Sequence, residues 1–412
     1  MSNEQSESPE LTDGNARRGG ELYMQTNELQ NAIIHYRWSA TGTLTEDERI
    51  PTGGSGSGGF SPIYLVNRPN DFEGAGSVIL TPDRRLLLTT NAGDNSVSSF
   101  RVGEGGKLTL LDVKPTGNPA TGRSGTADSL AYASSSRTLF VLHAFGPDHI
   151  RLMSVDDSGT LTLRPQSYSV NTHSKTDRVT TSTRLAPDER FLLVGIIFDE
   201  RPSTNPDGTP KFVFANTSDP DGLVVFPVGG DGALGAPSFH DGGGGVPFYF
   251  DFLHSRPDCF ITGTAVGDGL VMSRIDADGN IEIITPLVPI DTTRGKPSEL
   301  CWLVISPDDR LAFTTNFGYS NISSYRIDGT ALTIARDPAC PDVPGDGTFK
   351  AVNRRVSSGP SDMWITPDGA YLYQIYGNAS KLVGYAVHPD GSLDEITSMR
   401  IPYNGPQGLA GF

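Results

Sequence analysis

The segment LVGYAVHPDGSLDEI (382–396) contains two alternating apolar runs joined by the tight turn Asp390-Gly391-Ser392. An Asx-Gly turn between such runs predicts a β-hairpin, because glycine adopts the positive φ that the turn requires. Six other short turns of this kind stand along the chain, with their glycines at Gly42, Gly106, Gly159, Gly232, Gly279 and Gly329. Seven similar hairpins, none able to bury both of its faces alone, predict a bladed β-propeller.

A second turn, Pro-Asp, marks the register of these repeated units. Proline presets φ for a tight turn, and aspartate bonds to the backbone beyond it, so this dipeptide predicts the connection between a first and a second strand. It occurs at Pro82-Asp83, Pro187-Asp188, Pro257-Asp258, Pro307-Asp308 and Pro367-Asp368. Six units with four strand-like runs each follow, at 76–117, 126–170, 178–240, 246–290, 298–337 and 359–403.

The remaining unit lacks its first strand. Residues 21–53 contain three strand-like runs, and the C-terminal GPQGLAGF (405–412) resembles GPSDMWI (359–365), which opens the last unit. Because an open ring leaves sheet edges unpaired, we expect the C-terminal segment to complete blade one. The sequence therefore predicts an all-β fold with seven four-stranded antiparallel blades in a single domain, 21–412, after a polar tail at 1–20.

Composition limits the possible partners. The formal net charge is −16, which disfavours binding to nucleic acid or to an anionic membrane. No apolar run has the length of a membrane helix or of a signal peptide. Cys259, Cys301 and Cys340 are odd in number and widely spaced. We therefore expect a cytoplasmic protein, with a secreted protein whose signal was removed as the alternative.

The repeats LLLTTNAGDNSVSSFRV (86–102) and LAFTTNFGYSNISSYRI (311–327), together with GPQGLAG (405–411), resemble the lactonase-type seven-bladed propellers. That family includes 6-phosphogluconolactonases and carboxymuconate-lactonizing enzymes. The resemblance implies action on a small lactone or carboxylated molecule without a metal or other cofactor. The histidine-rich segment of the phosphogluconolactonases is absent at 177–185, which reads DRVTTSTRL, and this departure disfavours that substrate.

Loop lengths indicate which face carries the function. The Pro-Asp and Gly turns lie on one face of a propeller, here called the turn face. Connections between the second and third strands, and between blades, lie on the opposite loop face. The long insertions all fall on the loop face, at 54–75, 199–221, 240–246 and 337–358. Long loops on a rigid scaffold usually build the binding surface, so we expect a pocket enclosed by 54–75 and 337–358.

Three residues at the ends of predicted strands are candidates for catalysis. His143 can act as a base, Arg178 can hold a carboxylate or an oxyanion, and Glu299 can act as an acid. Each also has a structural alternative: a satisfied buried histidine, an inter-blade ion pair, or a hydrated carboxylate. The lactonizing relatives use a His, an Arg and a Glu without a metal, and His143, Arg178 and Glu299 are the nearest residues of these types in suitable positions of this chain, chosen by position rather than by a matching motif.

Other residues on inner strands, at strand ends or in long insertions are candidates for substrate binding. They are Arg68, Asp128, Tyr249, Trp302, Phe317, Asp362 and Tyr376. The seven histidines show no HxH or HExxH spacing, so no metal is predicted.

The sequence thus predicts an enzyme that hydrolyses a small, possibly anionic lactone in the central channel, or carries out the related cyclisation or isomerisation. Two alternatives stay open: a non-hydrolytic ring-forming enzyme of a biosynthetic pathway, and a non-catalytic propeller that binds a protein partner.

Overall fold

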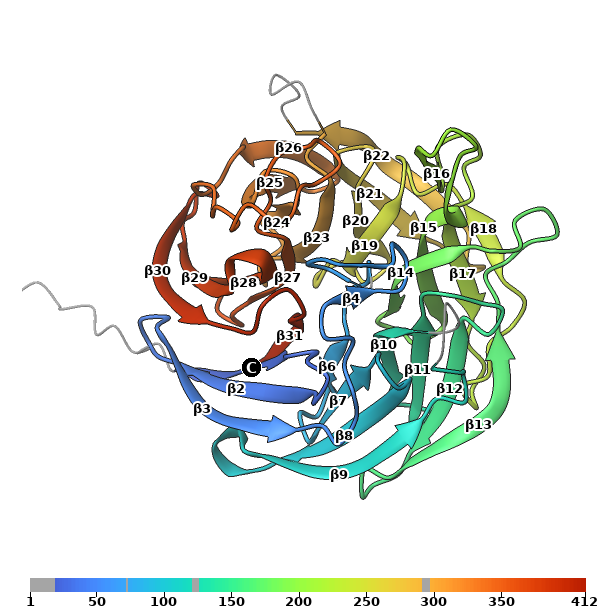
Figure 1. The fold of residues 1–412 in the computed structure, drawn as a ribbon, viewed down its shortest axis with the longest axis horizontal. Helices are drawn as coiled ribbons and strands as arrows, with labels where there is room; N and C mark the ends of the chain where they lie inside the picture. Colours follow the sequence, from blue (N-terminus) through green and yellow to red (C-terminus); the bar gives the residue numbers. More distant parts are fainter. Residues whose placement is uncertain (1–18, 72, 121–125, 291–296) are drawn as a thin grey trace, which may run out of the picture.

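The computed structural model describes residues 19–71, 73–120, 126–290 and 297–412 of the 412-residue chain. In these residues, seven antiparallel sheets stand around a central axis like the blades of a propeller (Figure 1). A small two-stranded sheet of β4 (Phe60–Ser61) and β5 (Val66–Asn67) is separate from the blades. The predicted all-β, seven-bladed fold is confirmed.

The blades follow one another along the chain, each beginning with its innermost strand. Blade two contains β6 (Val78–Leu80), β7 (Leu86–Asn91), β8 (Ser96–Val102) and β9 (Leu108–Pro115). Blade three contains β10 (Ala127–Ala133), β11 (Thr138–His143), β12 (Ile150–Val155) and β13 (Leu161–Tyr168). Blade four contains β14 (Val179–Leu185), β15 (Phe191–Thr204), β17 (Leu223–Pro227) and β18 (Ser238–His240), with β16 (Pro210–Phe214) paired to β15.

The last three complete blades repeat this order. Blade five contains β19 (Pro247–Phe252), β20 (Cys259–Thr264), β21 (Gly269–Ile275) and β22 (Ile281–Pro289). Blade six contains β23 (Leu300–Ile305), β24 (Leu311–Asn316), β25 (Asn321–Asp328) and β26 (Ala331–Arg336). Blade seven contains β27 (Pro360–Ile365), β28 (Tyr371–Tyr376), β29 (Lys381–Val387) and β30 (Leu393–Arg400). Short 3-10 helices lie at Glu104–Gly106 and Gly377–Ala379.

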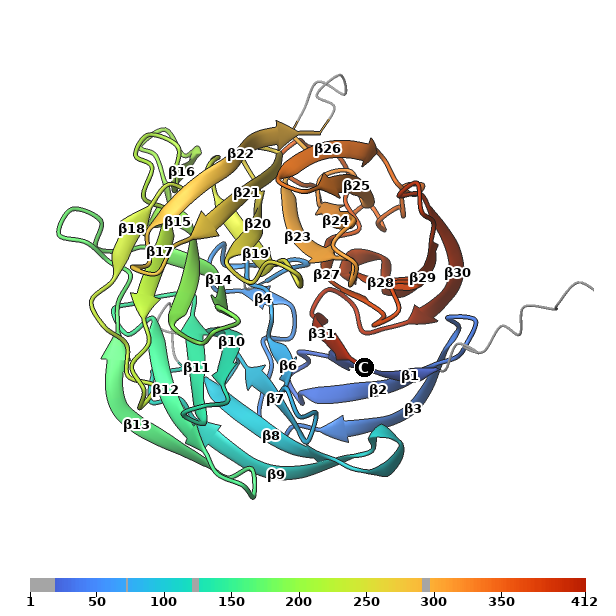
Figure 2. The same cartoon turned by 180° about the vertical axis from the view of Figure 1, so that it is seen from behind.

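Blade one is built from both ends of the described chain. It contains β1 (Gly20–Gln25), β2 (Ala32–Trp38), β3 (Leu44–Pro51) and, innermost, β31 (Gln407–Gly411). In the antiparallel pairing of β31 with β1, Leu22 lies opposite Gly411. The innermost strands contact one another in the cyclic order β31, β6, β10, β14, β19, β23, β27 and again β31 (Figures 1 and 2). The predicted closure by the C-terminal segment is therefore confirmed.

The seven glycine turns fasten neighbouring blades together. All seven glycines have a positive φ, from 57° at Gly329 to 87° at Gly391, which explains why glycine is required. Four of their carbonyls also accept a hydrogen bond from a hydroxyl of the preceding blade. These bonds run from Tyr373 to Gly42, Tyr23 to Gly106, Ser99 to Gly159 and Ser324 to Gly391.

The apolar core lies between blades rather than within them. In one cluster, Leu22, Ile34 and Tyr36 of blade one pack against Tyr373 and Ile375 of blade seven. Similar clusters join the other neighbouring blades, because each sheet buries both faces against its neighbours.

Two predicted loops contain regular structure. Residues 199–221 extend β15 and form a hairpin with β16, where Phe198 and Phe212 stack at 6.0 Å between ring centroids. Residues 54–75 include β4 and β5. The predicted tail lies outside the described residues up to residue 18, and β1 begins at Gly20. Within the described residues, no helix is long and apolar enough to span a membrane.

Candidate active site

The insertion at residues 54–75 lies over the central channel. Both views place β4 near the centre of the ring (Figures 1 and 2). Its C-terminal end is fixed to two inner strands, because the Ala75 N–H donates to Thr181 O at 3.2 Å and the Gly76 N–H donates to Asp362 Oδ1 at 3.1 Å. Beneath it, Ile63 packs in a buried apolar layer with Phe248, Trp302 and Phe317.

Within this insertion, Arg68 is held between two aromatic rings. Its guanidinium lies 4.0 Å from the centroid of Tyr64 and 5.1 Å from that of Phe349, which belongs to the 337–358 loop. One of its terminal nitrogens pairs with Glu73 Oε1 at 2.9 Å, and the Arg68 side chain is only 12% exposed. Its Nε is buried without a hydrogen-bond acceptor. A buried donor without an acceptor is costly, so this nitrogen is available to a ligand oxygen.

Glu299 stands beside Arg68 at the start of β23. Its φ of 55° is unusual for a residue other than glycine, and such strained positions concentrate at functional sites. The Val352 N–H, again from the 337–358 loop, donates to Glu299 Oε1 at 2.7 Å. Burial raises the pKa of Glu299 to about 7, and the positive charge of Arg68 opposes that rise. Both long loops therefore meet at the Arg68–Glu299 pair.

His143 has a structural environment. It is fully buried in blade three, where its Nε2 lies 2.9 Å from the Thr116 hydroxyl and its Nδ1 lies 3.3 Å from the carbonyl of His149. Burial lowers the pKa of His143 to about 3, so the ring is neutral at physiological pH. Both ring nitrogens already have partners, and we do not retain His143 as a proton carrier.

Arg178 belongs to an ion-pair network of blade four. Its terminal nitrogen pairs with Asp221 at 2.5 Å and with Asp199 at 3.1 Å, and Lys175 binds the same two carboxylates. The side chain is fully buried. Among the described residues, neither His143 nor Arg178 makes a hydrogen bond or ion pair with Glu299 or Arg68. The geometry thus separates the predicted catalytic residues, because His143 is hydrogen-bonded inside the fold and Arg178 is ion-paired within blade four.

Three predicted substrate-binding residues, Tyr249, Trp302 and Asp362, line a cavity of about 480 Å³ in the channel itself. Two further polar residues, Arg184 and Asp251, also line it and form an ion pair at 2.5 Å. Neither Arg184 nor Asp251 is among the candidates predicted from the sequence. The alternation of β14 and β19 places both residues on the channel side, but nothing local to either strand indicates that they pair.

The other three predicted binding residues differ in their surroundings. Phe317 is part of the apolar layer and packs against Phe349 at 5.6 Å between ring centroids. Asp128 is fully buried beside Gly74, and neither of its carboxylate oxygens has a hydrogen-bond partner. Burial raises the pKa of Asp128 well above its ordinary value. Tyr376 is buried in the core of blade seven, where its hydroxyl lies 2.8 Å from that of Tyr385.

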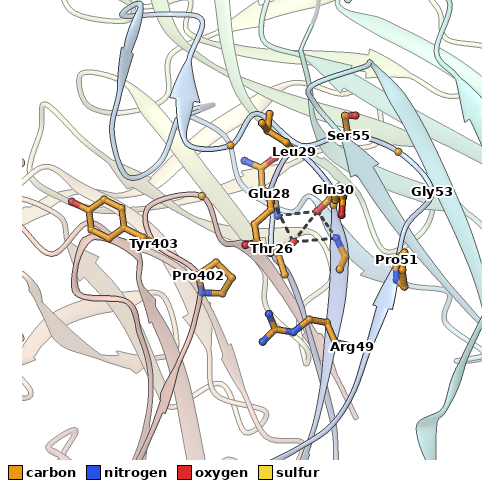
Figure 3. Close-up of a pocket in the computed structure, with 16 residues that line it drawn as sticks. Thr26, Glu28, Leu29, Gln30, Arg49, Pro51, Gly53, Ser55, Pro402 and Tyr403 are labelled. Atoms are coloured by element: carbon orange, nitrogen blue, oxygen red, sulfur yellow. Dashed lines mark hydrogen bonds between the residues drawn. The ribbon is translucent and has the colours of Figure 1, made fainter.

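A wider groove of about 970 Å³ lies on the loop face beside blade one. Figure 3 shows Pro402 and Tyr403 on one side of it, and Pro51 and Ser55 on the other. Its ionisable side chains are Glu28, Arg49 and Tyr403. None of the predicted site residues lines it. In the part of the chain that the structure describes, no group of three or more His, Cys, Asp or Glu is placed to hold a metal ion.

Residues 17–175 match the family model described as Lactonase, 7-bladed beta-propeller. The chain resembles the lactonase-type propellers in its seven-bladed fold and, over this segment, in its sequence. The predicted resemblance is thereby confirmed.

Solved structures similar to this chain extend over nearly its whole length. They include the periplasmic gluconolactonase of Pseudomonas aeruginosa, at 15% identity and a TM-score of 0.64, covering 95% of this chain and 99% of that one. A putative 6-phosphogluconolactonase of Bacteroides uniformis has 14% identity and a TM-score of 0.65, covering 96% and 99%. One of Bacteroides fragilis has 17% identity and a TM-score of 0.62, covering 98% and 100%. Likeness at these identities shows the fold alone, and no curated protein matches the sequence. The cytoplasmic location stays a prediction.

Proposed function

We propose that this protein hydrolyses a small lactone at the Arg68–Glu299 pair on the loop face. The observation that carries the proposal is a partly exposed carboxyl group whose pKa lies at about 7, beside a buried arginine whose Nε has no acceptor. A proton carrier is most effective when its pKa lies near the working pH, and a pre-positioned cationic donor stabilises a developing oxyanion.

The reaction would proceed through proton transfers at Glu299. The Glu299 carboxylate takes a proton from water as the water oxygen bonds to the lactone carbonyl carbon. Arg68 Nε–H donates to the carbonyl oxygen, which becomes negatively charged. The ring C–O bond then breaks, and the protonated Glu299 returns its proton to the leaving alkoxide, giving a hydroxy acid. Glu73 would hold the guanidinium in place through its ion pair.

Charge and surface composition favour an uncharged lactone. The Arg68 charge is already opposed by the Glu73 and Glu299 carboxyl groups, so a phosphorylated substrate would meet little net positive charge. Apolar side chains neighbour the pair on both loops: Leu65 and Val66 are 55% and 52% exposed, and Val352 is 64% exposed. An apolar, uncharged lactone ring fits these exposed apolar side chains better than a sugar phosphate does.

Cyclisation is a second candidate, and the pKa of Glu299 favours it too. At about 7, this group is protonated half of the time at neutral pH. It can then give its proton to one carbon of a double bond while a carboxylate of the same substrate closes a ring on the other carbon. Arg68 would orient that carboxylate.

Hydrolysis of dihydrocoumarin, an uncharged aromatic lactone, would test the proposal against a phosphorylated sugar lactone. We expect turnover of the uncharged lactone, with kcat/KM rising with pH around a midpoint near 7 as Glu299 loses its proton. Glu299→Gln should lower kcat by about 100-fold or more, because it cannot accept the proton. Arg68→Met should have a comparable effect on kcat/KM.

Arg355→Met is the matched control, because it removes a half-exposed positive charge from the same loop face without a contact to Glu299. It should retain wild-type turnover. Full activity of Glu299→Gln would show that another group moves the proton. Absence of both lactone hydrolysis and ring closure in the wild type would favour the protein-binding alternative.

A further inference from the structure

The central channel contains a cavity that Arg68 and Glu299 do not line. The cavity of about 480 Å³ is lined by residues of all seven innermost strands, β31, β6, β10, β14, β19, β23 and β27. Its rim includes His254, Pro307 and Pro367, which belong to the connections between first and second strands. The cavity therefore opens on the turn face. Its volume lies within the range of small-molecule sites.

The inner end of this cavity is closed by the apolar layer under residues 54–75. Trp302 belongs both to that layer and to the cavity wall. Neither Arg68 nor Glu299 lines the cavity. The two sites thus face opposite sides of the ring, with packed aromatic side chains between them.

The walls of the cavity combine polar and apolar surface, with hydrogen-bond donors at its inner end. The Trp302 side chain is 1% exposed, and its indole N–H has no hydrogen-bond acceptor. The Tyr249 hydroxyl makes no hydrogen bond to any residue that the structure describes. The apolar lining includes Val78, Leu80, Leu130, Leu303, Met363 and Leu409. A ligand oxygen that accepted bonds from these donors would satisfy them.

The charged side chains of the cavity wall are those of Arg184, Asp251 and Asp362. Arg184 pairs with Asp251, and its guanidinium lies 5.4 Å from the Tyr249 ring centroid. The Asp362 carboxylate accepts backbone N–H bonds from Gly76 at 3.1 Å and from Gly408 at 2.9 Å. A carboxylate ligand would meet Asp251 and Asp362. An ammonium ligand would lose its hydration and would meet one carboxylate without a cationic partner among the described residues, Asp362, whose oxygens already accept two backbone N–H bonds.

We propose that the channel is a binding site, separate from the catalytic pair, for a small uncharged molecule that has an apolar body and a carbonyl oxygen. Its body lies against the leucine and valine walls. Its carbonyl oxygen accepts hydrogen bonds from the Trp302 indole and the Tyr249 hydroxyl.

The test is to titrate acetophenone, benzoate or benzylammonium into the full-length ¹⁵N-labelled protein. Binding is measured from the NMR signals of the tryptophan indole N–H groups. Acetophenone should shift the Trp302 signal saturably, whereas the other two should bind at least tenfold more weakly. Trp38 is the internal control, because its indole already donates to Phe412 O at 3.3 Å outside the cavity. Trp302→Phe assigns the signal.

Two variants separate this site from the catalytic one. Tyr249→Phe should weaken acetophenone binding three- to tenfold, as expected for one lost hydrogen bond. Leu80→Trp should abolish the binding by filling the cavity, with thermal unfolding used to check that it folds. Glu299→Gln should lose hydrolysis and keep acetophenone binding. The proposal would be overturned if acetophenone did not shift the Trp302 signal, or if benzylammonium or benzoate bound as tightly as acetophenone. It would also be overturned if acetophenone, at the concentration at which it binds, inhibited the hydrolysis of dihydrocoumarin.

Discussion

At the residue scale, burial divides the titratable groups of this protein into two kinds. Glu299 is partly exposed, and its raised pKa makes it useful for proton transfer near neutral pH. His143 and His149 are sealed inside blade three, where burial lowers their pKa values to about 3 and about 4. Such histidines stay neutral in the folded protein, and they lower its stability in acid.

The first prediction concerns this acid sensitivity. Below about pH 6.5, a histidine in the unfolded chain binds a proton, whereas the buried ring in the folded protein stays neutral. The free energy of unfolding therefore falls as the pH falls from 6.5 toward 4. Each such ring should cost about 1.4 kcal/mol per pH unit over that window, and nothing above it. His143→Gln should therefore reduce the loss of unfolding free energy between pH 6.5 and 4.5, measured by urea denaturation.

His173→Gln is the control, since this histidine is exposed. Its urea midpoints should follow those of the wild type at every pH. An equal pH dependence in wild type and His143→Gln would contradict a neutral His143 in the folded state.

The roles of individual side chains were the hardest feature to predict from sequence. His143 and Glu299 both stand at strand ends on the loop face, and their local sequences do not distinguish them. The two residues differ in the groups around them. His143 is hydrogen-bonded to Thr116, whereas Glu299 lies beside the charge of Arg68 and accepts a hydrogen bond from the Val352 N–H. Likewise, Arg178 was a plausible anion holder until Asp199 and Asp221 were placed beside it. These partners lie in other strands and loops, so no spacing rule reveals them.

At the element scale, the glycine turns were predictable because their requirement is local. A positive φ at a two-strand connection calls for glycine wherever it occurs, and the Pro-Asp turns are equally local. The hairpin of β15 and β16 was not predicted, because its Pro- and Asp-rich sequence resembles a loop. Its strands are held by the stacking of Phe198, Phe212 and Phe214, which depends on their approach in space.

The turns give the second prediction. In Gly42→Ala, the new Cβ would lie 2.4 Å from Cδ1 of Tyr371, in a backbone with φ of 77°. Strain and crowding together should lower the free energy of unfolding by about 2–4 kcal/mol. Gly208→Ala has a similar φ of 85° but no atom within 4 Å of its Cβ, so it should lose only about 1 kcal/mol.

Denaturant unfolding of both variants would measure the difference. Equal losses would mean that backbone strain alone, and not the contact between blades one and seven, determines the need for glycine at position 42.

At the scale of the whole molecule, ring closure is the feature on which the other contacts depend. β31 pairs with β1 and also contacts the innermost strands of blades two and seven. The same closure gives the channel two different ends: one covered by the 54–75 insertion, and one open between the Pro-Asp turns. The lengths of the loops were enough to predict which face is the loop face. The open cavity at the other end could not be predicted from the sequence, because residues of every blade line it.

The third prediction follows from closure. A chain lacking residues 405–412 should lose cooperative thermal unfolding, because β1 keeps an unpaired edge. A circular permutant that joins Phe412 to Gly19 by a short Gly/Ser linker, and opens between Asp207 and Gly208, should keep it. These ends suit a linker because the Glu21 N–H donates to Phe412 O at 2.9 Å.

Calorimetry of the truncated chain and of the circular permutant would show whether each unfolds in a single cooperative transition. A cooperative transition in the truncated chain, at the wild-type temperature, would show that blade one is stable with three strands.

The pairing of β31 with β1 also has a consequence in the cell. During synthesis, β1 leaves the ribosome among the first strands, while its partner at residues 407–411 is made only after all the other blades. Throughout that interval the growing chain presents an open β-edge that any neighbouring nascent chain can join. The yield of native protein should therefore depend on how fast the ribosome reaches residue 411, and on whether a chaperone occupies that edge in the meantime.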